Sequence, residues 1–326
     1  GASGIVVVRY KIASVQSGSA KATGGAISYY NGRAIHTFLT PGSFENTSGS
    51  PLAIDYVLVG GGGAGMNDQG GGGGAGGVLT NIPGMMPATT SISDVQSGSP
   101  NALTISIGQG GHGRRSYNYK VQARNDGGDT TMSGTGINVT AIGGGGASAT
   151  NSPGASVDGV AQNYSGRPGG SGGSARYNRS PSQPGQGTAG QGNPSSGQNQ
   201  TGGGGGAGAP GGDGNANPGG HGGIGVQLPA IFRNPAETVG APGPGGGSFW
   251  VAGGGGGGHT DGQGGAWNGS SLVPGGPYAG GGNAQGNQGQ DGKDGTGGGG
   301  GGASSQTPTD YGGSGGSGIV LISYPV

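Results

Sequence analysis

Histidine is the side chain best suited to acid–base or metal chemistry near neutral pH, and the chain has four. They are His36, His112, His221 and His259, and none of them has the paired spacing of a metal site. The chain has no cysteine, which excludes thiolate ligands, cysteine nucleophiles and disulfides. His36 lies in the strand-like run AIHTFLT and is interpreted as structural. His221 and His259 follow glycines, so we expect them in turns or at the surface.

Other catalytic signatures are weak. No G-x-S-x-G motif stands between a strand and a helix, and G-x-G-x-x-G matches arise by chance in a chain this rich in glycine. Two segments, GGDGNANPGG (211–220) and GNQGQDGKDG (286–295), resemble a calcium-binding β-roll repeat but lack its aliphatic position, so calcium stays a minor alternative. We expect no catalytic residue, metal or cofactor, and hence no enzyme. An enzyme remains a distant alternative that a screen for glycan cleavage would expose.

Recognition chemistry is better represented. Tyr, Trp and Arg dominate binding hot spots, and rigid scaffolds commonly carry their binding residues on loops. Six segments bring large aromatic or basic residues between glycines: 114–124, 163–168, 175–180, 231–237, 266–272 and 273–280. For each segment the alternative is a solvated turn whose ring folds over neighbouring glycines. The candidate receptor-binding residues are Arg114, Arg115, Tyr117, Tyr119, Tyr164, Arg167, Arg176, Tyr177, Arg179, Phe232, Arg233, Trp267 and Tyr278.

Composition limits what can position these residues. Of 326 residues 95 are Gly and only 8% are charged, so a core of side chains cannot extend over the whole length. The 13 basic and 13 acidic residues cancel, which argues against nucleic acid as a partner. No apolar run approaches the length of about 18 residues that spans a bilayer, so we expect no membrane insertion.

Residues 13–142 are expected to form a β-rich unit. Short β-branched runs alternate there with turn residues, as in antiparallel sheets. No stretch has the 3.6-residue period of a helix, so helix content should be negligible. The expected strands are 4–12, 34–40, 52–60, 102–108 and 136–143.

Residues 143–318 are expected to form a glycine bundle. Glycines recur every third residue, for example from Gly286 through Gly289 and Gly292 to Gly298. Three residues is the period of a polyproline II helix, whose N–H and C=O groups must bond to neighbouring chains. Runs of up to six glycines, such as 253–258, are bare on every side and would lie in the interior. The predicted fold class is therefore mainly β with negligible helix, a small antiparallel β unit plus a polyglycine II bundle or sandwich.

A flexible Gly/Ser tether is the alternative to this bundle. Two features argue against it. The chain closes with a strong strand, GGSGIVLISYPV (315–326), which a tether would not require. Phe249, Trp250 and Trp267 also lie beside glycine runs, where a tether would be expected to avoid large apolar side chains.

The two ends of the chain share a motif. Residues 3–10 read SGIVVVRY and residues 317–324 read SGIVLISY. The copies either pair within one domain, or the first is the end of a preceding unit. The second interpretation fits better, because 22–44 reads as the fresh start of a unit. We therefore assign 1–12 to the terminal strand of a preceding unit and 319–326 to a closing strand.

The order of motifs over 22–324 resembles the glycine-rich repeat domain of bacteriophage tail fibres and tail-tip adhesins. The motifs are IHTFLTPGSF, IDYVLVGGGGAG, GGGGGAGGVL, LTISIGQGGHG, GGGGGAGAPG and a final GSGIVLISY. The resemblance implies a polyglycine II sandwich in an extracellular virion tail fibre. Its loops would bind a bacterial surface receptor, either an outer-membrane protein or a polysaccharide. Fibres of this kind are often trimeric, but the repeated end motif leaves open a head-to-tail structural array without receptor binding.

Overall fold

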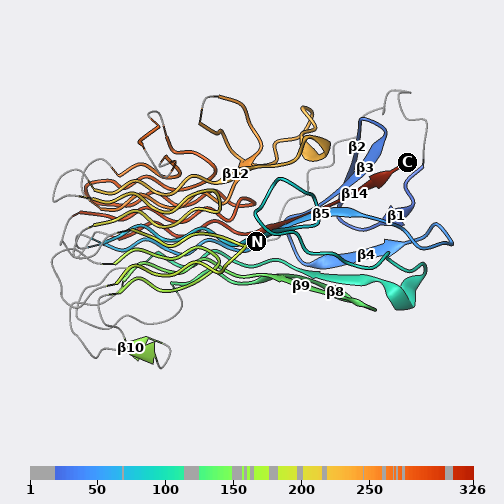
Figure 1. The fold of residues 1–326 in the computed structure, drawn as a ribbon, viewed down its shortest axis with the longest axis horizontal. Helices are drawn as coiled ribbons and strands as arrows, with labels where there is room; N and C mark the ends of the chain where they lie inside the picture. The colour runs from blue at the N-terminus through green and yellow to red at the C-terminus, as the bar shows by residue number, and fades with distance from the viewer. Residues whose placement is uncertain are drawn as a thin grey trace, which may run out of the picture.

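The two five-stranded sheets lie at one end of the fold and long glycine segments extend to the other, as Figure 1 shows in a computed structural model. The regions that the structure describes are 19–67, 70–113, 125–148, 156–157, 160–161, 165–175, 183–196, 201–214, 219–244, 246–258, 262–266, 268, 271–273, 276–304 and 311–326.

One antiparallel sheet has five strands. Turn residues separate its strands, and Thr, which the pleated surface of a sheet favours, recurs in most of them. In spatial order they are β1 (Ala22–Thr23), β4 (Gly42–Asn46), β7 (Leu103–Ser106), β8 (Thr130–Gly134) and β9 (Ile137–Ala141).

The second antiparallel sheet is completed by the last strand of the chain. β14 lies at its centre, between β3 and β5, with Val320 opposite both Phe38 and Leu58. A segment from the far end of the sequence thus closes a sheet that starts near residue 26. In spatial order the strands are β2 (Ala26–Tyr30), β3 (Arg33–Phe38), β14 (Ile319–Pro325), β5 (Asp55–Val59) and β6 (Val78–Thr80).

Side chains of β14 alternate between two apolar cores. Val320, Ile322 and Tyr324 join the core between the two sheets, whereas Ile319 and Leu321 join a second core on the opposite face. Both faces of the strand are therefore buried, which explains its continuous apolar sequence. The second core is covered by a lobe that comprises β12 (Val226–Gln227), the 3-10 turn η3 (Ala230–Phe232) and β13 (Trp250–Val251).

The prediction of a mainly β fold with negligible helix is confirmed. Among the described residues the only helical elements are 3-10 turns, η3 and η1 (Ser99–Asn101). Expected strands 34–40, 52–60, 102–108 and 136–143 correspond to β3, β5, β7 and β9, while 4–12 lies outside the described residues. The expected strands do not include β1, β2, β4, β6 or β8, nor the short pair β10 (Ser156–Val157) and β11 (Val160–Ala161).

Glycine segments continue directly from the strands. Beyond β5, the segment 60–66 donates backbone hydrogen bonds in three directions that repeat every third residue. Gly60 and Gly63 donate to Gly77 and Gly74, at 2.9 and 2.8 Å, and the residues between them donate to other segments. This is the three-residue period expected of a polyproline II helix.

Neighbouring segments surround 60–66. Among the described residues it donates to three segments and accepts from three others, so its backbone groups are paired without side chains. Several partners precede residue 143, so glycine segments from inside the 13–142 range join the bundle too. The acceptor segments are 70–77, 125–128 and 312–318, and the donor segments are 108–113, 143–147 and 297–303.

Close approach of the main chains requires glycine. A Cβ added to Gly255 would lie within 3.0 Å of the carbonyl oxygen of Gly300, closer than real Cβ atoms come. A Cβ on Gly300 would meet the carbonyl of Gly313 in the same way. In the bundle interior the obstacle is another backbone, which cannot rotate aside as a side chain can.

Candidate functional site

The far end of the glycine bundle, which we call the distal end, is defined by hydrogen bonds among residues remote from the sheets. The Gly258 amide donates to the Gly70 carbonyl at 2.7 Å, and the Ala303 amide donates to the Met66 carbonyl at 2.8 Å. Met66 ends the segment that leaves β5, so these residues lie opposite the β-strands (Figure 1).

Both ends of the described chain lie at the sheet end. The Lys21 side chain donates to the Pro325 carbonyl at 2.7 Å, and the Ala22 amide donates to the Tyr324 hydroxyl at 3.0 Å. The Val326 amide also donates to the Gly32 carbonyl at 3.1 Å. The backbone therefore enters and leaves the described fold side by side, and the distal end is remote from both points.

Most candidate receptor-binding residues lie outside the described residues: Arg114, Arg115, Tyr117, Tyr119, Tyr164, Arg176, Tyr177, Arg179 and Trp267. The described residues on either side of segment 114–124, which contains the first four of these candidates, lie at the distal end. Asn125 accepts a hydrogen bond from the Ala64 amide at 2.7 Å, and the Gly113 amide donates to the Ser314 hydroxyl at 3.1 Å. Gly113 and Asn125, the described residues on either side of 114–124, thus both lie at the distal side of the bundle.

Arg167 is a described candidate, and it makes structural contacts. Its Nε donates to both carboxylate oxygens of Asp126 at 2.7 Å, and its side chain is 17% exposed. Asp126 also accepts from the Gly146 amide at 2.8 Å. The pair thereby satisfies an outer amide of the bundle and leaves Arg167 little surface for a receptor.

The other described candidates lie near the sheets, away from the distal end. Phe232 is buried in the second core, so its ring has no surface to offer a receptor. Arg233 is half-buried, and its Nε donates to the Leu228 carbonyl at 2.6 Å. Tyr278 is half-buried, and its amide donates to the Gly264 carbonyl at 2.9 Å. The structure therefore does not bring all the candidates together.

Two exposed distal side chains were missed as candidates. Tyr311 is 36% exposed, and its hydroxyl donates to Gln288 Oε1 at 3.0 Å. His112 is exposed on the neighbouring segment that ends at Gly113. The sequence alone could have indicated Tyr311 as a candidate, because it is an aromatic residue directly before two glycines.

His36 forms a buried polar cluster at the sheet end. Its Nδ1 lies 2.6 Å from the Gly24 carbonyl, which can only accept, so Nδ1 carries the proton. Its Nε2 therefore accepts from the Tyr324 hydroxyl at 2.8 Å. Burial lowers the pKa of His36 below its ordinary value, with the Gly24 hydrogen bond opposing, and burial raises the pKa of Tyr324. The structural interpretation of His36 agrees with these contacts.

Aspartates of the segment that resembled a calcium repeat bind backbone amides. Asp291 accepts from the Ser314 amide at 2.6 Å, and Asp294 accepts from the Ser317 amide at 2.9 Å. Their three-residue spacing matches that of the amides they satisfy. At the bundle surface these carboxylates thus accept the hydrogen bonds that backbone carbonyl groups of a neighbouring segment accept in the interior.

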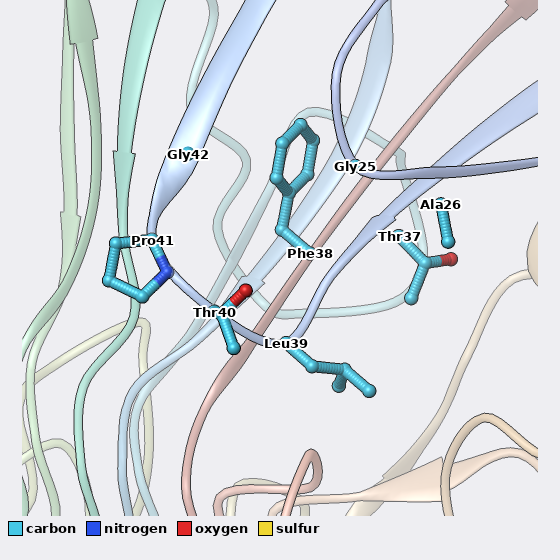
Figure 2. A pocket seen from close by; sticks show the side chains of 8 residues that line it. All are labelled: Gly25, Ala26, Thr37, Phe38, Leu39, Thr40, Pro41 and Gly42. Carbon is cyan, nitrogen blue, oxygen red and sulfur yellow. The ribbon is translucent and has the colours of Figure 1, made fainter. Parts of the chain in front are cut away.

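A shallow hollow of about 300 Å³ lies at the turn between β3 and β4. Figure 2 shows the Phe38 ring between Gly25 and Gly42, with Leu39 and Pro41 at the turn. Leu39 is 55% exposed. The lining is mostly apolar, and its polar side-chain groups are the hydroxyls of Thr37 and Thr40.

Two searches of the described residues give negative findings. No group of three or more His, Asp or Glu side chains is placed to hold a metal ion within the described ranges. Within those same ranges no helix is long and apolar enough to cross a membrane.

A family model described as a glycine-rich domain matches residues 39–325, which is most of the chain. A comparison with curated proteins finds none that matches.

Proposed function

The chain belongs to the glycine-rich domain family, and from that premise we propose that it is a receptor-binding domain of a bacteriophage tail fibre or tail-tip adhesin. It acts without catalysis and without a cofactor. Aromatic and basic residues carried at the distal end contact an outer-membrane protein or a polysaccharide of a bacterial surface. The domain is extracellular and part of a virion, with other fibre subunits as partners.

One observation carries this proposal: the chain enters and leaves the described fold at the sheet end. Lys21 and Pro325 are in contact there, whereas Met66 and Ala303 meet at the opposite end. A fibre subunit that packs against the sheet end would leave the distal end facing away from it. A rigid scaffold that projects its loops in this way is suited to surface recognition.

The candidates are refined by burial. Phe232 and Arg167 have structural contacts, so the proposal rests on the candidates that lie outside the described residues, with Tyr311 and His112 added. Arginine and tyrosine predominate among them. These side chains suit polysaccharide as well as protein, because aromatic faces stack on sugar rings and guanidinium groups bind anionic substituents.

Cell binding tests the proposal. We would measure adsorption of the labelled full chain to a panel of bacteria, and compare the distal variant Arg114→Ala, Arg115→Ala, Tyr117→Ala, Tyr119→Ala with a sheet-end control, Ile27→Ser. Ile27 is 40% exposed on an edge strand, so the control should fold. We expect the distal variant to lose most binding and the control to keep it.

Other outcomes bear on the proposal directly. Equal binding by the distal variant and the control, or no adsorption to any cell, contradicts it. Protease treatment of the cells separates the receptor classes, since it removes binding to a protein and spares binding to a polysaccharide.

A structural repeat of a fibre is the second candidate function, favoured by the repeated motif at 3–10 and 317–324. The later copy forms β14, the central strand of a sheet. A fibre built of such units would hold them through their sheet ends. Unchanged cell binding by the distal variant, with filament assembly altered by a sheet-end variant and not by the distal one, would favour this function.

A further inference from the structure

A series of buried hydrogen bonds ties β1 to β14, the last strand of the chain, and it takes no part in receptor binding. The Ala22 amide donates to the Tyr324 hydroxyl at 3.0 Å, and that hydroxyl donates to His36 Nε2 at 2.8 Å. On the other side of the ring, His36 Nδ1 donates to the Gly24 carbonyl at 2.6 Å. We call Ala22, Gly24, His36 and Tyr324 the β1 latch.

The β1 latch lies where the chain passes from one sheet to the other. β1 is at the edge of the first sheet, whereas β2, β3 and β14 belong to the second. Gly24 and Gly25 connect β1 to β2, with positive φ angles of 107° and 63°. His36 holds this crossing through both ring nitrogens, directly at Gly24 and through Tyr324 at Ala22.

Outside the latch, β1 is attached over a short length. It pairs with β4 at two residues, and the Thr47 amide donates to the Lys21 carbonyl at 2.8 Å. β5, in contrast, is paired along both sides, with β14 and with β6. Short edge segments open with a smaller free energy than central strands, so β1 can separate before the rest of the fold.

Protonation of His36 is incompatible with the β1 latch. Neutral His36 donates from one nitrogen and accepts at the other, which matches a carbonyl on one side and a hydroxyl hydrogen on the other. With a proton on Nε2 both nitrogens donate, so the Tyr324 hydroxyl would receive two N–H groups while its own hydrogen lost its acceptor. His36 and Tyr324 are fully buried, so water does not replace the lost hydrogen bond.

The surroundings of His36 do not compensate a positive charge. Glu45 follows Phe44, whose ring packs edge-on against the His36 ring at a centroid distance of 5.0 Å. Because side chains alternate along a strand, Glu45 points away from this ring, as Arg33 of β3 does. The titratable or charged residues on His36's own strand and on the elements packed against it are Arg33 on β3, Tyr29 on β2, Glu45 on β4, Tyr324 on β14 and Lys21 before β1.

We propose that His36 makes the β1 latch sensitive to pH: its protonation releases β1 and the crossing at Gly24 from β14, while the other strands of both sheets stay folded. The start of the described fold is then held firmly at neutral pH and is free to move in acid.

The sign follows from where the proton is bound more tightly. Burial lowers the pKa of His36 in the closed latch, whereas a released His36 has its ordinary pKa of about 6.5. Opening therefore takes up a proton. The open fraction rises as the pH falls below about 6.5, by about tenfold per pH unit until the closed form also binds the proton.

Amide hydrogen exchange of the full chain tests the proposal. The Ala22 amide reports opening of the latch, and the Leu58 amide, in the doubly paired strand β5, reports unfolding of the whole fold. Rates are corrected for the intrinsic pH dependence of exchange. We expect the protection of Ala22 to fall about tenfold per pH unit below about pH 6.5, and Ala22 to exchange much faster than Leu58 at every pH.

Two variants separate the proton from the hydroxyl. His36→Gln cannot titrate, so the pH dependence of Ala22 protection should disappear. Tyr324→Phe removes the acceptor of the Ala22 amide, so Ala22 should lose about tenfold of its protection already at pH 7.5.

Tyr56→Phe is the matched control. Its hydroxyl is in the same core and donates to the Thr90 carbonyl at 2.9 Å, outside the β1 latch. It should lower the protection of Leu58, because global unfolding breaks that hydrogen bond, and leave the protection of Ala22 unchanged.

Each contrary result overturns the proposal. Protection of Ala22 that does not depend on pH, or a pH dependence that persists in His36→Gln, would show that His36 does not govern the opening. Exchange of Ala22 as slow as that of Leu58, or an equal loss at both in Tyr56→Phe, would show that β1 separates only when the whole fold unfolds. Unchanged protection of Ala22 in Tyr324→Phe would remove Tyr324 from the latch.

Discussion

Leu58 and Gly255 are both fully buried, but they are buried against different material. Leu58 lies between two sheets among apolar side chains, and its burial removes hydrocarbon from water. Gly255 lies among other glycine backbones, to which it is hydrogen-bonded. The two packed sheets are therefore stabilised mainly by side chains, and the bundle by paired main-chain groups at close approach.

The junction between the two regions shows what glycine changes. Val59 pairs within the plane of its sheet, whereas the next residues donate to segments in three directions. Segments can then be surrounded by neighbours, which a sheet with side chains on both faces does not allow. One chain thus continues two packed sheets into a bundle that is held together mainly by main-chain hydrogen bonds.

A side chain in the bundle interior should have the largest effect. Gly255→Val forces its Cβ against the Gly300 carbonyl, so backbone has to move. We expect a loss of more than about 4 kcal/mol in the free energy of unfolding, enough to prevent folding of a marginal domain. Urea denaturation and protease resistance would measure it, and parental values for both would refute the packing described for the bundle.

A cavity in the core between the two sheets should have the next largest effect. Leu58→Ala removes a buried side chain from the core between the sheets and should cost about 3 kcal/mol. The result sharpens the comparison, since here a smaller residue destabilises, while in the bundle a larger one does. A change below about 1 kcal/mol would indicate that this core is not closely packed.

Acid should lower the free energy of unfolding through His36, which lies in the core region of the two sheets. Its folded-state pKa is lowered, so the unfolded chain binds the proton more tightly. The stabilising effect of neutral His36 is present above about pH 6.5 and is lost as the pH falls below that value. Unfolding measured between pH 7.5 and 5 should show this loss, and His36→Gln should flatten it. A slope that survives the substitution would assign it to other groups.

Loss of a surface carboxylate should have the smallest effect. Asp291→Ala leaves the Ser314 amide to water at the edge of the bundle, and we expect a cost of about 0.5 to 1 kcal/mol. Chemical denaturation of this variant would be compared with that of Glu45→Ala, a change at the sheet end. A loss as large as that of Leu58→Ala would mean that the bundle depends on its edges more than on its interior.

The sequence was enough to predict several features of the fold. β-branched runs predicted β3, β5, β7 and β9, and the strong apolar run at 319–326 predicted a closing strand. The spacing from Gly286 to Gly298 predicted the three-residue period, because only bare positions can face neighbouring backbone. Weaker strands such as β8 (TTMSG) have no strong local pattern and depend on tertiary pairing.

Candidate site residues were harder to predict. Residue type alone does not distinguish an exposed ring from a buried one, and Phe232 is buried because a lobe folds over β14. Arg167 pairs with Asp126, a residue 41 positions away whose proximity depends on the order of segments in the bundle. Tyr311 lies outside the six candidate segments, although it directly precedes two glycines.

The most direct test of the account compares alanine at two glycines of one segment. A Cβ on Gly289 would lie within 3.0 Å of the Gly301 carbonyl, whereas one on Gly286 meets nothing within 4 Å. The account predicts that Gly289→Ala lowers the free energy of unfolding by about 3 kcal/mol, while Gly286→Ala changes it by less than about 1 kcal/mol. Equal denaturation midpoints for the two variants would contradict it.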